Sequence, residues 1–413
     1  MSGVASEEFD LVIVGGGLAG ASLAAAVGGA GRRIAVIEPF PAGDERQPSF
    51  DERTIALTWA SRRVFEGLGA WPALGDDACP ITSIHISDRG HFGAARLTAA
   101  DAGTAALGYV VPARRLGAAL AARLDTLDGV DLICPATAEH LERSDGAVAV
   151  TLGDGRRLEA PLVVLADGGR STLGTETGLA LPLRRYPHKA LVAVVGIDRD
   201  HGHRAFERFT EHGPLALLPV TGRRMAVAWT LPGEEAEKLR TAADDVFLAA
   251  LQDDFGDRAG RFVRAGGRRV YPLSLGRLAR PAAARVVAIG NAAHIVHPVA
   301  GQGFNLGLRD VAELADLLVA AWRDGEDIGA DMLLDRYAAS RAAQTRRVSA
   351  FTDGLISLFT SSGLGPLRGL GLAAVDRMPP LRRFFLGRTM GLAGRLPRLT
   401  RGLGAWTRPR QAP

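Results

Sequence analysis

Cysteine is scarce in this chain of 413 residues, which contains only Cys79 and Cys134. Two isolated thiols exclude a disulfide framework and a metal site built from four thiolates. The chain also lacks any run of about 18 uninterrupted apolar residues, so we expect no segment to span a bilayer. Its first ten residues are polar and acidic, unlike an apolar signal segment. These absences predict a globular protein of the reducing cytoplasm.

Lysine is equally rare, at Lys189 and Lys238, so the basic residues are nearly all arginine. Residues 355–413 contain ten arginines and one acidic residue, which gives this segment a charge of +9. Because the net charge of the whole chain is +4, the remaining residues carry a charge of −5. Apolar residues interleave with these arginines, while glycine and proline interrupt any long helix. The pattern fits a surface that meets anionic lipid, or a helical cap with a solvated basic face. No nucleic-acid recognition motif accompanies it.

A glycine pattern near the N-terminus is the first positive signal. A short apolar strand leads into Gly15-x-Gly17-x-x-Gly20, an alanine-rich helix follows, and a second strand at residues 34–37 ends on Glu38. In such a unit the glycines permit a tight turn, approach of backbone to a pyrophosphate, and close helix–strand packing. The terminal acid is placed to bind a ribose hydroxyl. The complete unit predicts a dinucleotide site rather than an ordinary β–α turn.

A second glycine-rich segment lies far from the first, at residues 285–308. The apolar run 286–289 predicts a buried parallel strand. The spacing of apolar residues from Phe304 to Trp322 predicts an amphipathic helix. The charged residues of this helix are expected elsewhere on its surface: Arg309, Asp310, Glu313 and Asp316.

Gly301 and Gly303 stand at the start of this predicted helix. Bare backbone N–H groups and the positive end of the helix dipole can approach an electron-rich ligand there. Combined with the N-terminal glycine pattern, this segment indicates a flavin.

The middle of the chain alternates between two kinds of pattern. A strand at residues 162–166 ends on Asp167, and alternating segments from about 191 to 229 predict an antiparallel sheet. The chain returns to the nucleotide fold at residue 285. We therefore expect a discontinuous FAD-binding domain made of residues 1–80, 101–180 and 275–350. An inserted substrate domain should comprise residues 81–100 and 181–274. Residues 351–413 should form a basic helical C-terminal region.

Other groups of residues give weaker evidence of a functional site. His294 and His297 lie three residues apart, but no third carboxylate or thiolate is near in sequence, so no metal site is expected. Residues 169–173 lack the second glycine of a hydrolase nucleophile elbow. No second Gly-x-Gly-x-x-Gly follows a strand, so NAD(P)H has no Rossmann domain of its own. A transiently bound electron donor is consistent with this absence.

Three separated motifs stand in a fixed order, namely the N-terminal glycine pattern, Asp167-Gly168, and Gly290-Asn291 followed by Pro298-x-x-Gly301-x-Gly303-x-Asn305. In this combination the chain resembles the class A flavoprotein monooxygenases, FAD-dependent aromatic hydroxylases with the p-hydroxybenzoate hydroxylase fold. Within them it looks most like the ubiquinone-biosynthesis hydroxylases that act on 2-polyprenyl-6-methoxyphenol. The closer likeness is carried by residues 87–91, 204–210, 213–219 and 300–307.

The resemblance implies an α/β fold in which a Rossmann-type FAD-binding domain carries an inserted antiparallel-sheet substrate domain and a helical C-terminal segment. It implies that NAD(P)H reduces FAD, that O₂ is activated at the flavin C4a position, and that the ring of a prenylated phenol is hydroxylated. Arg53 beside the flavin and the backbone carbonyl of Pro298 are the implied catalytic groups. The implied cofactor-binding residues are Gly15, Gly17, Gly20, Glu38, Arg53, Asp167, Gly290, Asn291, Gly301, Gly303, Phe304 and Asn305.

A lipid substrate and a basic tail together imply a peripheral position on the inner membrane, beside other ubiquinone-biosynthesis proteins. Two alternatives remain open from the sequence. One is a sister hydroxylase that acts at another ring carbon, and the other is a flavin-binding scaffold of the biosynthetic complex without catalytic activity.

Overall fold

The computed structural model describes residues 6–44, 46–47, 53–296, 301–360 and 365–407. Its central sheet has six strands in the order β20-β21-β13-β2-β3-β9. All neighbours are parallel except β20, which runs antiparallel to β21. The strands are β2 (Leu11–Val14), β3 (Ile34–Ile37), β9 (Val130–Ile133), β13 (Val163–Leu165), β20 (Ala282–Ala283) and β21 (Val286–Ala288).

Two layers cover this sheet because its strands are apolar on both faces. Leu11 and Ile13 of β2 point to a core shared with helices, whereas Val12 and Val14 point to a core shared with a second sheet. The helices are α1 (Leu18–Val27), α4 (Ala113–Leu124) and α8 (Gln302–Asp324). The second sheet has the order β1-β12-β11-β10, with β1 (Ser6–Glu8), β10 (Ala138–Arg143), β11 (Val148–Leu152) and β12 (Arg157–Ala160).

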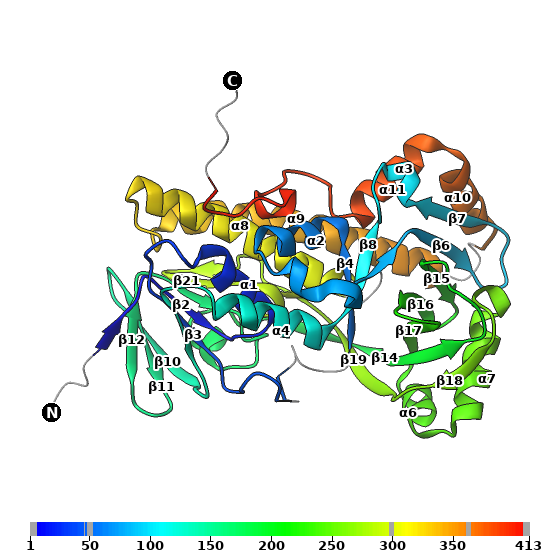
Figure 1. Cartoon of the computed structure of the whole chain (residues 1–413), viewed down its shortest axis with the longest axis horizontal. Coiled ribbons are helices and arrows are strands. Elements are labelled where there is room, and N and C mark those ends of the chain that lie inside the picture. Colours follow the sequence, from blue (N-terminus) through cyan, green and yellow to red (C-terminus); the bar gives the residue numbers. More distant parts are fainter. Residues whose placement is uncertain (1–5, 45, 48–52, 297–300, 361–364, 408–413) are drawn as a thin grey trace.

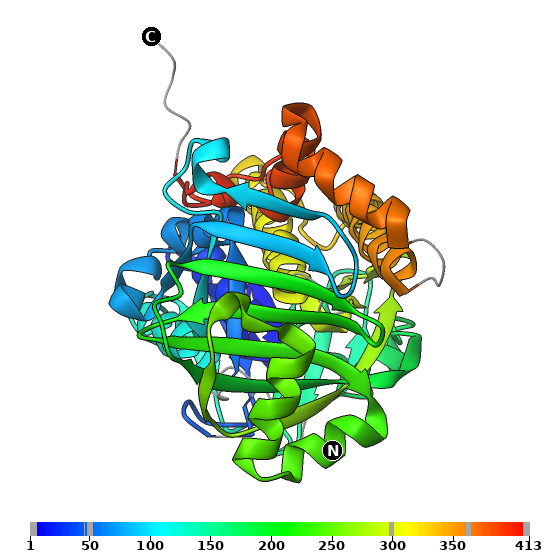
Figure 2. The ribbon, with the colours of Figure 1, turned by 90° about the vertical axis from the view of Figure 1, so that its right-hand side faces the viewer.

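A larger, mainly antiparallel sheet lies beside the nucleotide domain (Figure 1). Its order is β22-β19-β14-β17-β16-β15-β6-β7, and β18 also pairs with β14. Helices α6 (Gly233–Thr241) and α7 (Asp244–Phe255) cover one face, while the other face looks toward the nucleotide domain (Figure 2). The strands are β6 (Ser83–Asp88), β7 (Ala94–Thr98), β14 (Leu183–Ile197), β15 (Arg204–Thr210), β16 (Gly213–Val220), β17 (Arg224–Pro232), β18 (Phe262–Ala265), β19 (Arg269–Arg277) and β22 (His294–Ile295).

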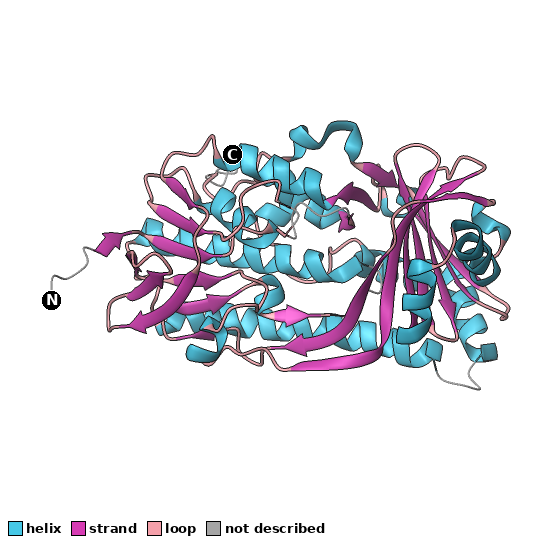
Figure 3. Ribbon diagram, turned by 90° about the horizontal axis from the view of Figure 1, so that it is seen from below, coloured by secondary structure: helices cyan, strands magenta, loops and turns pink. Residues whose placement is uncertain are grey.

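A small sheet of three strands, β4-β8-β5, joins the two parts. Seen from below, strands gather toward both ends of the long axis with helices between them (Figure 3). The remaining short elements are β4 (Thr54–Thr58), β5 (Cys79–Ile81), β8 (Gly108–Pro112), α2 (Trp59–Gly67), α3 (Ala99–Ala102), α5 (Leu173–Glu176), and the 3₁₀ turns η2 (Trp71–Asp77), η3 (Asp257–Ala259), η4 (Gly290–Ala292) and η6 (Leu399–Arg401).

The C-terminal region is helical and then returns to the nucleotide domain. After α9 (Asp331–Thr360), helix α10 (Gly365–Arg377) packs on β7, and α11 (Pro379–Thr389) follows at a proline. Beyond α11, Leu399 is buried in the core beside α2 and α8. The indole Nε1 of Trp406 donates to the carbonyl of Val27 at 3.0 Å. Residues 391–407 therefore form a packed cap on the nucleotide domain.

The fold class predicted from the sequence is the one observed, although four expected domain boundaries fall inside single elements. The 80/81 boundary lies within β5, the 100/101 boundary within α3 and the 274/275 boundary within β19. The 350/351 boundary lies within α9. Residues 343–353 contain neither glycine nor proline, so nothing in the sequence ends the helix there. No helix among the described residues is long and apolar enough to cross a membrane.

Candidate flavin site

Three predicted motifs follow neighbouring strands of the six-stranded sheet. The turn after β2 begins at Gly15, Asp167 follows β13, and Gly290 follows β21. Because these strands are parallel and adjacent, their carboxyl ends meet at one edge. Glu38 follows β3, on the other side of β2. The chain adds β3 and β9 on one side of β2 and later adds β13 and β21 on the other side. Ligands of open α/β sheets bind at such a reversal of strand order.

The first turn is shaped by glycines that no other residue could replace without displacing backbone. Gly15 has φ +107°, a value that favours glycine. A Cβ at Gly20 would lie 1.9 Å from the carbonyl oxygen of Gly15, so α1 can approach this turn only with a glycine there. Gly17 is the N-cap of α1 and supplies no side-chain cap. The first N–H groups of α1 thus remain available, and this cradle fits the pyrophosphate of FAD.

Glu38 is held against this turn. Its Oε2 accepts a hydrogen bond from the N–H of Gly16 at 2.8 Å, and its Oε1 accepts one from the N–H of Phe40 at 3.1 Å. Burial raises the pKa of Glu38, although the hydrogen bonds from Phe40 and Gly16 act in the opposite direction. Carboxylate oxygens accept more than one hydrogen bond each, so a ribose hydroxyl can still be bound here.

Asp167 and Asn291 lie in touching loops at the same edge. The Oδ1 of Asp167 accepts from the N–H of Gly169 at 3.0 Å. Its Oδ2 accepts from the N–H of Ser171 at 2.9 Å and from the hydroxyl of the same serine. A Cβ at Gly168 would contact the Cβ of Asn291 at 4.0 Å, and Asn291 itself is exposed. Asp167 therefore shapes its own loop, while the Asn291 side chain is available to a ligand.

The start of α8 is fastened to strand β4 by Asn305. Its Oδ1 accepts from the N–H of Thr58 at 2.9 Å, and its Nδ2 donates to the carbonyls of Ala56 at 2.8 Å and Gly301 at 2.6 Å. Both amide donors are thus used within the protein. A contact between Asn305 and a flavin would be made by backbone. Gly301, with φ +61°, is the N-cap, so the helix begins with unpaired N–H groups.

The remaining predicted site residues are distributed over three places. The guanidinium of Arg53, which immediately precedes β4, lies over the ring of Tyr271 in β19, 5.1 Å from its centroid. Phe304 packs near Phe65 of α2, with ring centroids 6.5 Å apart. Gly303 faces Val296. Pro298 lies outside the described residues.

A buried charged cluster supports the Gly290 turn. The Oδ2 of Asp310 accepts from the N–H of Gly290 at 2.8 Å and lies 2.7 Å from the Nε2 of His294, while its Oδ1 accepts from the Nε of Arg341 at 2.6 Å. Burial raises the pKa of Asp310, but attraction by His294 and Arg341 outweighs it, and the pKa is lowered. The cluster joins the turn to both α8 and α9.

The prediction that Arg309 and Asp310 lie on the outer surface of α8 was wrong. They are only 6% and 1% exposed. The guanidinium of Arg309 donates to the carbonyls of Gly391 and Ala393 at 2.9 Å each. Burial, together with repulsion from Arg341, lowers the pKa of Arg309 to about 10. The C-terminal cap covers one side of α8 and α9 covers another, so almost the whole helix is enclosed.

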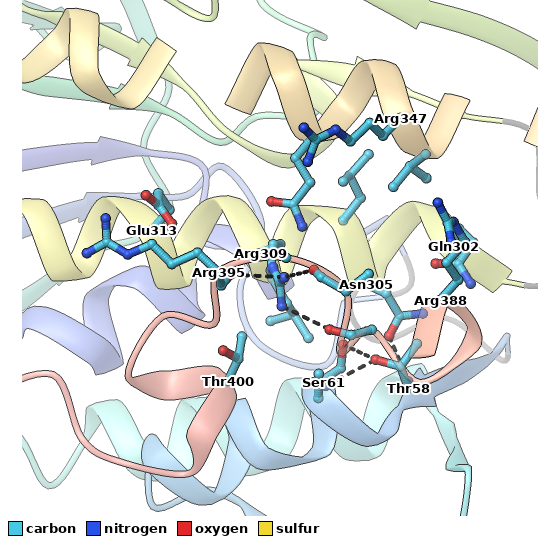
Figure 4. Close-up of a pocket in the computed structure, with 18 of the residues that line it drawn as sticks. Thr58, Ser61, Gln302, Asn305, Arg309, Glu313, Arg347, Arg388, Arg395 and Thr400 are labelled. Carbon is cyan, nitrogen blue, oxygen red and sulfur yellow. Dashed lines mark hydrogen bonds between the residues drawn. The ribbon is translucent and has the colours of Figure 1, made fainter. Parts of the chain in front are cut away.

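A cavity of about 460 Å³ lies between α2, α8, α9 and the C-terminal cap (Figure 4). Thr58 and Asn305 line its end near the start of α8, and Arg395 lines the side formed by the cap. This cavity could not be predicted from the sequence, because its walls come from segments far apart in the chain. No group of three histidine, cysteine, aspartate or glutamate side chains within the described part of the chain is arranged to hold a metal ion.

Comparison with known proteins complements this geometry. Residues 8–352 match a family described as FAD binding domain. Ubiquinone hydroxylase UbiL of Rhodospirillum rubrum is 38% identical over 98% of this chain and 95% of that protein. The 3-demethoxyubiquinol 3-hydroxylase of Escherichia coli is 31% identical over 93% of this chain and 98% of that protein. The structure of p-nitrophenol 4-monooxygenase PnpA from Pseudomonas putida shares the fold, with a TM-score of 0.78, 20% identity and coverage of 94% and 99% of the two chains.

Proposed function

Since the chain belongs to the family of FAD-dependent monooxygenases, we propose that it hydroxylates the aromatic ring of a polyprenylated phenol in ubiquinone biosynthesis. The strongest single support is the likeness to ubiquinone hydroxylase UbiL over nearly the whole length of both chains. The geometry agrees with it, because three motif loops meet at one sheet edge. FAD bound there would take two electrons from NAD(P)H and pass them to O₂.

The residues of this chain would hold the reactants in place. The N-terminus of α1 would bind the pyrophosphate, and Glu38 would bind a ribose hydroxyl. The positive end of α8, held to β4 by Asn305, would stabilise negative charge on the reduced flavin ring. We place the aromatic substrate between this edge and the larger sheet, where protein walls can keep water from the reactive oxygen.

The ring position distinguishes two candidate substrates. One is 2-polyprenyl-6-methoxyphenol. The other is favoured by the Escherichia coli relative, whose name specifies position 3 of demethoxyubiquinol. Purified protein should consume NAD(P)H in a substrate-dependent way and convert one of the two compounds to a product heavier by one oxygen atom. Consumption of NAD(P)H that yields only hydrogen peroxide with both compounds would contradict the proposal.

We also propose that the protein attaches peripherally to the inner membrane, through a surface formed by α10, α11 and the β6–β7 turn. This tip surface lies at the upper right of Figure 1. It exposes large apolar side chains, namely Phe92, Leu367, Leu370, Met378 and Phe384, each 50–80% exposed. Soluble proteins rarely group such residues without a binding partner.

The charges around the tip surface favour an anionic bilayer. Arg377, Arg383 and Arg388 are exposed there, and the guanidinium of Arg388 lies 3.7 Å from the ring centroid of Phe384. Arg368, by contrast, is buried, and its Nε forms an ion pair with the Oδ2 of Asp88 at 2.8 Å. Its charge is therefore paired within the protein. Exposed arginines beside apolar anchors suit anionic lipid. The C-terminal region thus combines a packed cap with a candidate lipid surface.

Substitutions on the tip surface test this proposal. Replacing Phe92, Leu370 and Phe384 together with serine should weaken sedimentation with phosphatidylglycerol-containing vesicles by about tenfold or more, since one inserted side chain contributes roughly 1.5–3 kcal/mol. FAD content should not change. Met332→Ser, which alters a residue 66% exposed at the start of α9, is the matched control. Undiminished vesicle binding by the triple variant would contradict this surface. Truncation is unsuitable because it removes buried Met390 and Leu399.

A further inference from the structure

The two faces of the larger sheet have different surroundings. In β15, Phe206 points toward α7, where its ring packs on Phe255 with centroids 5.3 Å apart. Its register neighbours Leu217 and Val227 are buried in the same core. Because side chains alternate along a strand, Glu207 points to the opposite face. That face looks toward the nucleotide domain (Figure 2).

Glu207 belongs to a row of side chains that crosses five central strands. The register places it beside Ile86 of β6 and Ala216 of β16, and the row continues through Ala228 to Val192. All five residues are partly exposed, whereas the side chains of the neighbouring row, which face α7, are buried. We call these five residues the open row. Helix α9 contacts β15 and β16.

The open row shares its face with a residue that contacts the flavin site. Tyr271 of β19 is in register with Ala190, which lies two residues from Val192 on the same face of β14. Arg53, adjacent to β4, lies over the Tyr271 ring. The same β4 is held to the start of α8 by Asn305. The open row and the flavin site therefore border the same space between the two parts of the molecule.

The Glu207 carboxyl has no internal role that the structure reveals. Its Oε1 is shielded from solvent and has no hydrogen-bond partner among the described residues. Its row neighbours are apolar. On the same face Asp88 is paired with Arg368 of α10 and with His91 of the hairpin turn, so it is already compensated. A buried polar group without a partner is rare and calls for a functional explanation.

The same carboxyl is a cost to folding. Burial raises the pKa of Glu207 from 4.5 to about 7. Because the folded pKa is the higher one, stability decreases as pH rises from the unfolded value through the folded value. A glutamine of the same shape would not carry this cost. A destabilising group on an open face is typical of a functional site.

We propose that Glu207 binds the hydroxyl of the phenolic substrate and accepts its proton during hydroxylation, an inference that rests on the proposed function. A phenol supplies the hydrogen-bond donor that this carboxylate lacks. Ala216 and Ala228, which follow Glu207 in the open row, have small apolar side chains against which an aromatic ring can pack. Withdrawal of the phenolic proton makes the ring more electron-rich and therefore more reactive toward an electrophilic oxygen atom.

The proposed step balances in atoms and electrons. The ring carbon forms a bond to one oxygen atom of O₂ while the phenolic proton moves to the Glu207 carboxylate. NAD(P)H supplies two electrons and one hydrogen as hydride, and solvent supplies one proton, so that the second oxygen atom is released as water. The resulting dienone loses the hydrogen of the hydroxylated carbon as a proton, and its carbonyl oxygen regains a proton from Glu207. The carboxylate is thereby restored for the next turnover.

Two substrates and two variants test the role of Glu207. The substrates are a short-chain prenylated methoxyphenol and its O-methyl ether, which has no proton to donate. Glu207→Gln should retain FAD and bind the phenol with a KM within a few-fold of wild type, but should lose about 100-fold or more in hydroxylation kcat. NAD(P)H should then be consumed with release of hydrogen peroxide. Glu211→Gln, which changes an exposed glutamate just after β15, is the matched control.

Two readouts separate catalysis from a structural role. The wild-type rate should rise as pH passes about 7, where Glu207 ionises, and the Gln variant should lack this rise. The wild type should prefer the phenol to the ether, and the variant should lose this preference. The melting temperature of the Gln variant should exceed that of wild type at alkaline pH.

The outcomes distinguish this inference from the proposed function. If wild type hydroxylates the phenol and Glu207→Gln matches it in rate, pH profile and preference, Glu207 has no such role and the proposed function stands. If the wild-type protein binds the phenol and its ether equally well, this result alone contradicts the inference, whatever the variants show. If wild type hydroxylates no prenylated phenol, the proposed function itself fails, and the role of Glu207 with it.

Discussion

Replacement of Gly20 with alanine is expected to give a protein without FAD. The new methyl carbon would lie 1.9 Å from the carbonyl oxygen of Gly15, and the obstructing atom belongs to backbone. Helix α1 would have to move away from the turn after β2, which destroys the cradle for the pyrophosphate. Overpacking alone typically costs about 1–3 kcal/mol. The ratio of flavin absorbance to protein in the purified variant measures the effect.

Gly146→Ala is the matched control for this variant. An added Cβ at Gly146 meets nothing within 4 Å, and this glycine lies in the exposed turn between β10 and β11. The control should purify with full flavin content and an unchanged melting temperature. A Gly20→Ala protein with the flavin content of wild type would show that the pyrophosphate does not bind at this turn.

Replacement of Asp310 with asparagine is expected to destabilise the protein by about 3–5 kcal/mol, because it leaves a buried cation without its counter-charge. Arg341, whose side chain is 1% exposed, donates to Asp310, and His294 is 3% exposed. The Gly290 turn should loosen as well, since its N–H is bound to the same carboxylate. Chemical denaturation of wild type and variant, both saturated with FAD, measures the difference.

Asp335→Asn provides the comparison for this experiment. Asp335 pairs with Arg280 on the surface, where the two side chains are 59% and 50% exposed. Exposed ion pairs contribute about 0–1 kcal/mol, so this variant should remain close to wild type. Equal losses in the two variants would mean that the buried cluster has no special weight in the stability of the nucleotide domain.

The flavin edge could be predicted because its determinants are local. The turn after β2 is specified by glycines within six residues, and the strand that leads to Glu38 is the next one along the chain, after α1. The parallel pairing that unites β2, β13 and β21 follows from three apolar strands with motif-bearing loops. The fold class and the cofactor could therefore be predicted from the sequence.

The interior of α8 and the open row could not be predicted in the same way. Arg309 and Asp310 are charged residues of an amphipathic helix, and the usual expectation places them in solvent. They are buried because Arg341 and residues 391–395 arrive from far along the chain. The residues around Glu207 do not alternate between apolar and polar side chains, and the face that α7 covers is determined only by tertiary packing.

Transfer of oxygen from O₂ to the ring tests the central claim most directly. The FAD-loaded protein should be supplied with NAD(P)H, the prenylated phenol and dioxygen labelled with a heavy oxygen isotope, and the product should be analysed by mass spectrometry. We predict a hydroxylated phenol that carries one labelled oxygen atom, with one NAD(P)H consumed for each molecule formed. A product whose new oxygen derives from water, or the absence of any hydroxylated product, would contradict the assignment of this protein as a flavin-dependent phenol hydroxylase.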